Sequence, residues 1–232
     1  MKQRILITAH SGCEGTPDNS IASIQTAIAL GADCAEVDIR MDAQGRLWLT
    51  HDLTAFFAGL TPLEDAFSLI RDSGIAVNCD LKEYGALLPV LSLADEFGIG
   101  PEKLIFSGSV DTALLERQPE IARRSRVFLN SEELARDLLK ADPPDRIGQT
   151  AFFLSHPETV ASRLRALGAE ALNAPYKHMP NALIAVLRAN GVALSLWTLN
   201  NEAALKEFME KDLLSVTTRC VSLALSIRDA RA

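Results

Sequence analysis

Residues 34–41, with the sequence CAEVDIRM, form the stretch that decides the fold. Their apolar content predicts a buried β-strand, and the strand period of two places Glu36 and Asp38 on the same face, roughly 6–7 Å apart. Burial of unpaired carboxylates costs several kcal/mol each. The stretch therefore predicts a strand whose two carboxylates share a positive partner, and a divalent cation is the simplest one.

Strand segments and amphipathic helix segments alternate along the rest of the chain, which predicts a parallel sheet with crossover helices. The expected strands lie at residues 4–9, 34–41, 76–82, 104–107, 126–129, 171–174, 192–199 and 213–217. The phenylalanine pair at residues 151–154 is an alternative for the sixth strand. The expected helices lie at residues 21–30, 63–72, 86–97, 112–118, 132–140, 158–167, 181–189 and 202–209. The first of them should begin after Asn19 and Ser20, which are capping residues, and end at Gly31.

A hairpin interrupts this alternation directly after the second strand. Residues 42–46, DAQGR, have a turn sequence and join that strand to an extended run at residues 47–50, which delivers His51. The Pro-rich stretch at residues 142–146 is short and is expected to be a surface loop.

The chain has 232 residues, of which 48% are hydrophobic, and this fits a single domain of α/β barrel size over residues 1–232. Its formal net charge is −7, and it has no cluster of lysine and arginine. Nucleic acids and anionic membranes both require such a cluster, so neither is expected as a stable partner. The sequence leaves the oligomeric state open.

The N-terminus enters the first strand after residues 1–4, so no signal peptide is expected and a cytoplasmic protein is indicated. The four cysteines show neither close pairing nor the spacing of zinc ligands; they are Cys13, Cys34, Cys79 and Cys220. Neither disulfide bonds nor a zinc site is therefore predicted.

A second strand carries charged residues toward the same site. In residues 76–82, strand alternation places Asp80 and Lys82 on one face. The ends of the strands in a closed parallel barrel meet at one mouth, so Asp80 can join the two carboxylates of residues 34–41 there. Carboxylates are hard oxygen ligands, which suit Mg²⁺ or Ca²⁺ rather than a soft metal. The candidate metal ligands are Glu36, Asp38 and Asp80.

Short polar motifs follow one another along the chain. They are HSG at residues 10–12, PDNS at 17–20, GAD at 31–33, EVD at 36–38, HD at 51–52, NCDLK at 78–82, the strand-end Ser107 and WTLN at 197–200. In order and spacing they resemble the motifs HRG, PENT, GAD, ExD, HD, NxExK and WTxN of the glycerophosphodiester phosphodiesterase family, within the PI-PLC-like phosphodiesterase superfamily. Each motif alone is weak evidence, but the ordered set spans most of the chain and is highly specific.

The resemblance implies a TIM (β/α)8 barrel that hydrolyses small glycerophosphodiesters to glycerol 3-phosphate and an alcohol, with Mg²⁺ or Ca²⁺ as cofactor. His10 and His51 would act as general acid and base, because imidazole titrates near neutral pH. Lys82 would neutralise the phosphate, the alternative being a structural ion pair with Asp80 in the barrel interior. Trp197 would pack at the mouth and line the glycerol site, with core filling as the equal alternative. The candidate substrate-binding residues are Lys82, Ser11, Asn19 and Trp197.

The chain departs from the family motifs in its charged side chains. Ser11 replaces the motif arginine beside the first histidine, and the loss of such a phosphate contact can cost about 2.7–4 kcal/mol of transition-state stabilisation. Arg40 and Arg219 are the candidates to compensate. Asp18 and Asp80 stand where the motifs have glutamates, which shortens each side chain by one methylene group.

The stretch at residues 52–63 is shorter than in the family and predicts a more open mouth. Together with Ser11, it leaves two other functions open. One is a catalytically weak or silent family member that binds a phosphorylated ligand. The other is a related phosphodiesterase that acts on a different head group, such as that of a lysophospholipid.

Overall fold

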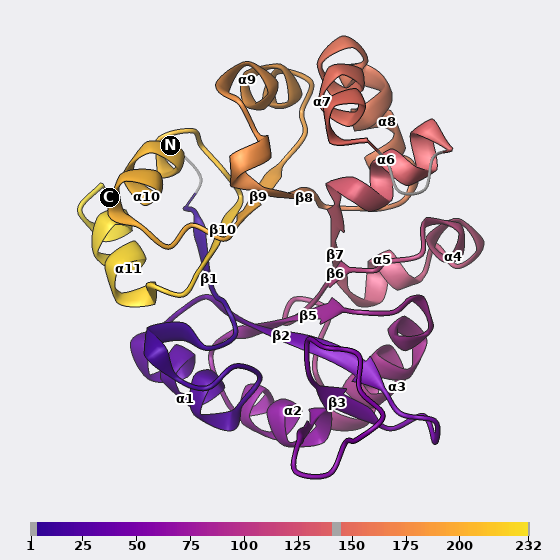
Figure 1. The fold of residues 1–232 in the computed structure, drawn as a ribbon, viewed down its shortest axis with the longest axis vertical. Helices are drawn as coiled ribbons and strands as arrows, with labels where there is room; N and C mark the ends of the chain where they lie inside the picture. The colour runs from indigo at the N-terminus through magenta and orange to yellow at the C-terminus, as the bar shows by residue number, and fades with distance from the viewer. Residues whose placement is uncertain (1–3, 141–144, 232) are drawn as a thin grey trace.

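Eight parallel strands close into a barrel in the computed structural model, which describes residues 4–140 and 145–231. In order around the ring they are β1 (Leu6–Ala9), β2 (Cys34–Met41), β5 (Ala76–Leu81), β6 (Leu104–Gly108), β7 (Arg126–Asn130), β8 (Ala171–Pro175), β9 (Leu194–Trp197) and β10 (Ser215–Thr218). The ring closes because β1 pairs with both β2 and β10. Helices surround the strands (Figure 1), so the expected TIM barrel is confirmed.

The helices follow the strands and cover the outside of the barrel (Figure 1). They are α1 (Ile21–Leu30), α2 (Leu63–Arg71), α3 (Leu87–Phe97), α4 (Thr112–Arg117), α5 (Ile121–Arg124), α6 (Ser131–Leu139), α7 (Arg146–Ser155), α8 (Pro157–Ala166), α9 (Asn181–Ala189), α10 (Glu202–Met209) and α11 (Val221–Asp229). Short 3-10 turns are η1 (Cys13–Gly15), η2 (Tyr84–Ala86) and η3 (Tyr176–His178). Within the residues described, none of the helices has the length and apolar character needed to cross a bilayer.

The hairpin after β2 is present as expected. β3 (Leu47–Leu49) pairs antiparallel with β2, and the two-residue β4 (Thr61–Pro62) pairs with β3. Asp42 organises the turn, because its side chain accepts hydrogen bonds from the backbone of Gln44 and Arg46 and from the indole of Trp48. Although desolvation opposes ionisation, these bonds lower the pKa of Asp42 to about 2.

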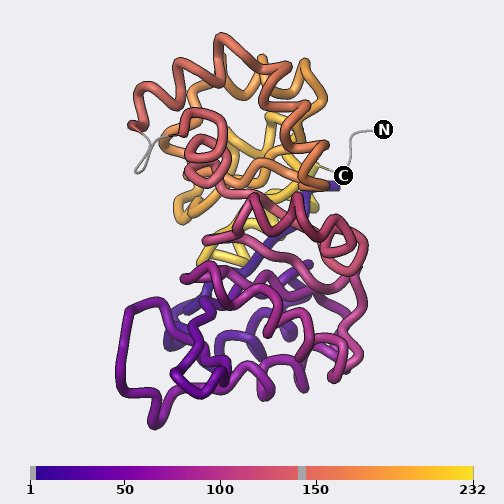
Figure 2. Tube along the Cα trace, turned by 90° about the vertical axis from the view of Figure 1, so that its right-hand side faces the viewer, coloured from indigo at the N-terminus to yellow at the C-terminus, as the bar shows by residue number. Residues whose placement is uncertain are grey.

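The segment between β3 and β4 carries His51 at its start and stands away from the barrel (Figure 2). Its side chains Leu53 and Phe56 are 83% and 86% exposed. His51 therefore belongs to a projecting segment, whereas His10 directly follows a barrel strand.

Residues 151–154 lie inside α7, so the alternative assignment of the sixth strand is wrong and residues 171–175 form that strand. The side chain of Asp145 caps α7 by accepting hydrogen bonds from the backbone of Ile147 and Gly148. Of the expected loop at residues 142–146, positions 142–144 lie outside the described residues and position 146 begins α7. The terminal helix α11 was not predicted.

The two faces of the barrel strands differ in polarity. One set of alternate positions is apolar and buried under the helices; it includes Ile7, Val37, Val77, Phe106, Leu129, Leu172, Leu196 and Val216. The other set points into the barrel, where an apolar cluster at the amino end contains Cys34, Ile105, Phe128, Ala171 and Leu214. Toward the carboxyl end the inward positions become polar; they are Thr8, Glu36, Asn78, Ser107, Asn130, Asn173, Ser195 and Thr217. Because the inward positions become polar toward the carboxyl ends of these strands, a functional site inside the barrel is expected at that end.

Asp33, in the GAD motif, joins three segments at the amino end of the barrel. Its carboxylate accepts a hydrogen bond from Ile7 N at 2.8 Å and pairs with Arg228 at 2.6 Å and with Arg4 at 2.8 Å. The side chains of Asp33 and Arg228 are only 13% and 12% exposed, so water compensates poorly for a lost partner.

We expect Asp33→Asn to lower the free energy of unfolding by about 2–4 kcal/mol, because it leaves the largely buried Arg228 guanidinium with only the exposed Asp229 carboxylate as an anion among the residues described. Urea denaturation measures this loss. The matched control is Asp72→Asn, since Asp72 is 70% exposed and pairs only with the adjacent Arg71 among the residues described. That change should stay below about 0.5 kcal/mol. Equal effects of the two substitutions would contradict the assigned role of Asp33.

Candidate active site

The carboxyl ends of the barrel strands surround a cavity of about 360 Å³. Seven of the nine residues predicted for the site line it; they are His10, Glu36, Asp38, His51, Asp80, Lys82 and Trp197. Other lining residues include Asn78, Ser107, Gly108, Asn130, Glu132, Glu133, Asn173 and Thr217. Segments separated by most of the chain length therefore meet at one mouth, as a TIM barrel requires.

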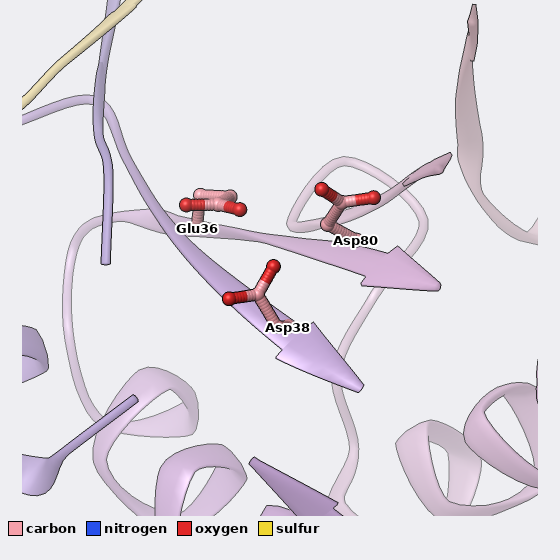
Figure 3. Close-up of side chains that lie close together, drawn as sticks. All are labelled: Glu36, Asp38 and Asp80. Atoms are coloured by element: carbon pink, nitrogen blue, oxygen red, sulfur yellow. The ribbon is translucent and has the colours of Figure 1, made fainter. Parts of the chain in front are cut away.

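Three carboxylates converge inside this cavity. Glu36 and Asp38 lie on β2, and the parallel register with β5 places Asp80 directly beside Asp38. One oxygen from each carboxylate lies within 4.8 Å of the others. Figure 3 shows the three side chains approaching one another from the two strands. The convergence predicted from strand alternation is therefore observed.

Lys82 provides the ammonium partner of the cluster. Lys82 Nζ lies 2.7 Å from Asp38 Oδ1 and 2.9 Å from Asp80 Oδ2. Burial opposes the charge of Lys82, but the nearby Asp80 and Asp38 carboxylates outweigh it and raise the pKa of Lys82. Lys82 is therefore positively charged at neutral pH and offsets part of the negative charge.

The negative charge that remains on the cluster is unfavourable for the folded protein. Desolvation, followed by repulsion from Asp38 and Asp80, holds the pKa of Glu36 well above its ordinary value. Burial also raises the pKa of Asp80, although Lys82 acts in the opposite direction. These shifts are those of a site that has more anionic groups than the protein neutralises by itself.

The residues present fit a divalent cation. Asp80 Oδ1 is buried and lacks a hydrogen-bond partner among the residues described, as a donor oxygen reserved for an ion would. Gly108 keeps the adjacent space open, because a Cβ atom at that position would lie 2.0 Å from the same oxygen. Three carboxylate ligands are a donor set for Mg²⁺ or Ca²⁺. Glu36, Asp38 and Asp80 would hold such an ion.

Ser11 and Asn19 lie behind the carboxylates, and neither is among the described residues that line the cavity. Ser11 N donates to Glu36 Oε2 at 2.9 Å, and Ser11 Oγ accepts from Asn19 N at 2.5 Å. The Asn19 side chain donates to Asp38 Oδ2 at 2.8 Å and accepts from Asp38 N at 2.9 Å. Ser11 therefore orients the carboxylate of Glu36, and Asn19 orients the carboxylate of Asp38. The expectation that Asn19 caps α1 is wrong, because Ser20 is the cap and accepts from Ser23 N.

Both predicted histidines line the cavity, in different environments. His10 Nδ1 lies 2.8 Å from the carbonyl oxygen of Ser11 and 3.8 Å from Glu36 Oε2, and its side chain is 25% exposed. His51 Nδ1 lies 2.9 Å from Asp52 Oδ1, and its side chain is 68% exposed. Because each Nδ1 faces an oxygen acceptor, each imidazole is assigned a proton there, which leaves Nε2 for proton exchange with a ligand.

Neither arginine considered as a substitute for the motif arginine lines the cavity. Arg40 donates to the backbone carbonyl oxygens of His51 and Lys82, at 3.0 and 3.4 Å. Arg219 pairs with Asp18 at 2.8 Å, and both of these side chains are exposed. Of the described residues that line the cavity, Lys82 is the one lysine or arginine.

A polar network on the opposite side of the cavity was not predicted. The side chains of Asn130 and Asn173 lie 2.8 Å apart. The surroundings of Asn173 favour the orientation in which its nitrogen donates to Ser195 Oγ at 2.9 Å and its oxygen accepts from Trp197 Nε1 at 3.2 Å. This network holds the indole that the sequence assigned to substrate binding. Its signal was available, because Asn130 and Asn173 occupy the same inward positions at the ends of neighbouring strands.

The known proteins that this chain resembles include a family model and relatives of the same kind. The model of the Glycerophosphoryl diester phosphodiesterase family matches residues 10–73. A glycerophosphodiester phosphodiesterase of Caldanaerobacter subterraneus subsp. tengcongensis is 26% identical over 243 residues, which cover 90% of this chain and 89% of the relative. The resemblance inferred from the motifs is therefore confirmed.

Solved structures give the same fold. A glycerophosphodiester phosphodiesterase from Parabacteroides distasonis has a TM-score of 0.76 at 16% identity and covers 100% of this chain and 99% of its own. An Oleispira antarctica phosphodiesterase in complex with the product sn-glycerol-3-phosphate has a TM-score of 0.74 at 17% identity, with 97% and 96% covered. At these identities the structures establish the barrel fold.

We expect Glu36→Gln to stabilise the metal-free protein at neutral pH. The pKa of Glu36 is higher in the folded than in the unfolded chain, so the folded state binds more protons above about pH 4.5, and its stability falls as the pH rises through this range. Glutamine has no charge to repel its neighbours. The gain should reach about 1 kcal/mol or more, or roughly 2–4 °C in melting temperature for a chain of this size.

Thermal melts of wild type and Glu36→Gln in a chelator, from pH 5 to pH 8, test this prediction. The difference between the two proteins should widen as the pH rises. A difference that stays constant over the whole range would show that ionised Glu36 is not destabilising.

We expect Ser11→Ala to weaken Mg²⁺ or Ca²⁺ binding by about tenfold, because Asn19 loses the acceptor that fixes its backbone and therefore holds Asp38 less firmly. Isothermal titration calorimetry measures the affinity. Ser68→Ala is the control, since Ser68 Oγ bonds only to the carbonyl oxygen of Glu64 on the outside of α2 among the residues described. Unchanged affinity in Ser11→Ala would argue that Asn19 holds its place without Ser11.

Proposed function

We propose that the chain is a member of the glycerophosphodiester phosphodiesterase family, to which it is similar over most of its length, and that it hydrolyses glycerophosphodiesters to sn-glycerol 3-phosphate and an alcohol. The observation that carries the proposal is the convergence of three buried carboxylates in a cavity that His10 and His51 also line. Acidic ligands and two imidazoles around one cavity suit metal-assisted phosphoryl transfer with general acid–base catalysis.

A divalent cation bound by Glu36, Asp38 and Asp80 would polarise a phosphoryl oxygen and lower the pKa of a coordinated hydroxyl group. The protein side chains supply proton transfer. One histidine removes the proton of the glycerol 2-hydroxyl at its Nε2 atom, and the hydroxyl oxygen attacks phosphorus. The other histidine protonates the departing alcohol oxygen as its bond to phosphorus breaks.

The cyclic phosphate that results is opened by water with the two histidines in reversed roles, which yields glycerol 3-phosphate and restores both imidazoles. Lys82 provides positive charge beside the reacting phosphate. The hydrogen bonds of Ser11 and Asn19 keep Glu36 and Asp38 in place during both steps.

A second candidate function is ligand binding without turnover. It is favoured by Ser11, which removes a cation from the position where the family motif has arginine. A phosphorylated ligand would then be held by Lys82 and the metal site alone. Such a protein would be stabilised by its ligand but would release no product.

We expect the purified protein to release glycerol 3-phosphate from glycerophosphocholine in Mg²⁺ or Ca²⁺, and His10→Ala to lower kcat/KM by about 10²- to 10⁴-fold through loss of an acid–base group. An enzyme-coupled assay for glycerol 3-phosphate measures both. The control is His156→Ala, because His156 stacks on Phe152 at the surface. Thermal stabilisation by diesters without product release, in either metal, would favour the silent binding protein instead.

A further inference from the structure

The cavity has a surplus of negative charge. Apart from the three carboxylates of the cluster, Lys82 and the two histidines, the acidic or basic lining residues among those that the structure describes are Glu132 and Glu133. Both lie in the first turn of α6, directly after β7. A bound divalent cation and Lys82 together balance the three cluster carboxylates and leave the two glutamates uncompensated within the cavity lining.

The two glutamates differ in their partners. Glu133 Oε2 accepts hydrogen bonds from Arg136 Nη1 at 2.7 Å and from the Tyr84 hydroxyl at 2.9 Å, so its charge is neutralised locally. Glu132 Oε2 has only the Ser131 hydroxyl, at 3.1 Å, and pairs with no cation in the described part of the chain. Glu132 is therefore the carboxylate whose charge is available to a ligand.

The position of Glu132 follows from the order of the strands in the barrel. In the ring of eight strands β7 is the fourth strand from β1, so the start of α6 lies across the mouth from His10. Only β6 separates β7 from β5 in the ring, so one end of a diester whose phosphate rests against the cluster on β2 and β5 can reach the start of α6. The cavity of about 360 Å³ is small enough to keep that end close to its walls.

We propose that Glu132 is a specificity-determining residue that favours diesters whose leaving alcohol carries a positive charge, such as a quaternary or primary ammonium group. The inference rests on the proposed hydrolase function. A zwitterionic diester brings a cation of its own into a cavity where Lys82 is the one lysine or arginine among the described lining residues. A neutral alcohol gains nothing from Glu132, and an anionic one is repelled by it.

The test compares glycerophosphocholine with glycerophosphoglycerol, which have the same reacting phosphodiester but a cationic and a neutral leaving alcohol. We expect wild type to prefer glycerophosphocholine in kcat/KM. Glu132→Gln should lower kcat/KM for glycerophosphocholine by about fivefold, the effect of one partly exposed ion pair, and change that for glycerophosphoglycerol by less than about twofold. Circular dichroism and thermal melting establish that the variant is folded.

The matched control is Glu158→Gln. Glu158 is an exposed carboxylate and is the second residue of α8, just as Glu132 is the second residue of α6. It is not among the described residues that line the cavity. Glu158→Gln removes the same unit of negative charge from the protein as Glu132→Gln, so a general effect of net charge would appear in both variants. We expect Glu158→Gln to retain the wild-type preference.

The outcomes separate the two proposals. Hydrolysis of both diesters at equal rates by wild type, or an equal loss on both in Glu132→Gln, overturns the role of Glu132 and leaves the hydrolase function intact. Release of glycerol 3-phosphate from neither diester overturns the hydrolase function, and the role of Glu132 with it. A loss confined to glycerophosphocholine supports the proposal.

Discussion

The parallel pairing of β2 with β5 is the constraint on which the site depends. It brings Asp38 and Asp80 side by side and leaves Glu36 one inward position deeper, with a single ammonium group between the first two. Burial and mutual repulsion raise the pKa of Glu36 and of Asp80, so the isolated protein tolerates an unfavourable arrangement. A fold retains such a cluster when the ligand that relieves the repulsion belongs to its function.

The apolar layers on both sides make this arrangement possible. Side chains outside the strands pack against the helices, and an apolar cluster closes the amino end of the barrel, so the polar inward positions are confined to the carboxyl end. Glu36 and Asp38 are buried there, which strengthens the electrostatic interactions between the charged groups of the cluster. Gly108 shows how closely the backbone follows the cluster, since any side chain there would collide with Asp80.

Sequence reasoning succeeded where a simple period controls the structure. The period of two within residues 34–41 and 76–82 was enough to place three carboxylates on the same face of two neighbouring strands, and the motifs added the two histidines. It failed where geometry depends on several segments at once. The apolar run at residues 151–154 suits a strand or a helix equally, and the cap at Asp145 decides for the helix. Asn19 resembles a helix cap, but its left-handed backbone (φ 51°) turns its amide toward Asp38 instead.

Ser11 shows how one replacement can change two properties together. An arginine side chain has only hydrogen-bond donors, so it could not accept the bond that Ser11 Oγ receives from Asn19 N. The serine that stands in place of the motif arginine thus also supplies the acceptor that fixes Asn19, and through it Asp38. Neither Arg40 nor Arg219 restores the lost charge, because both are engaged outside the cavity. The balance of charge around the cluster is then more negative than the family motifs imply, and under the proposed hydrolase function the charge that a substrate carries would be part of its recognition.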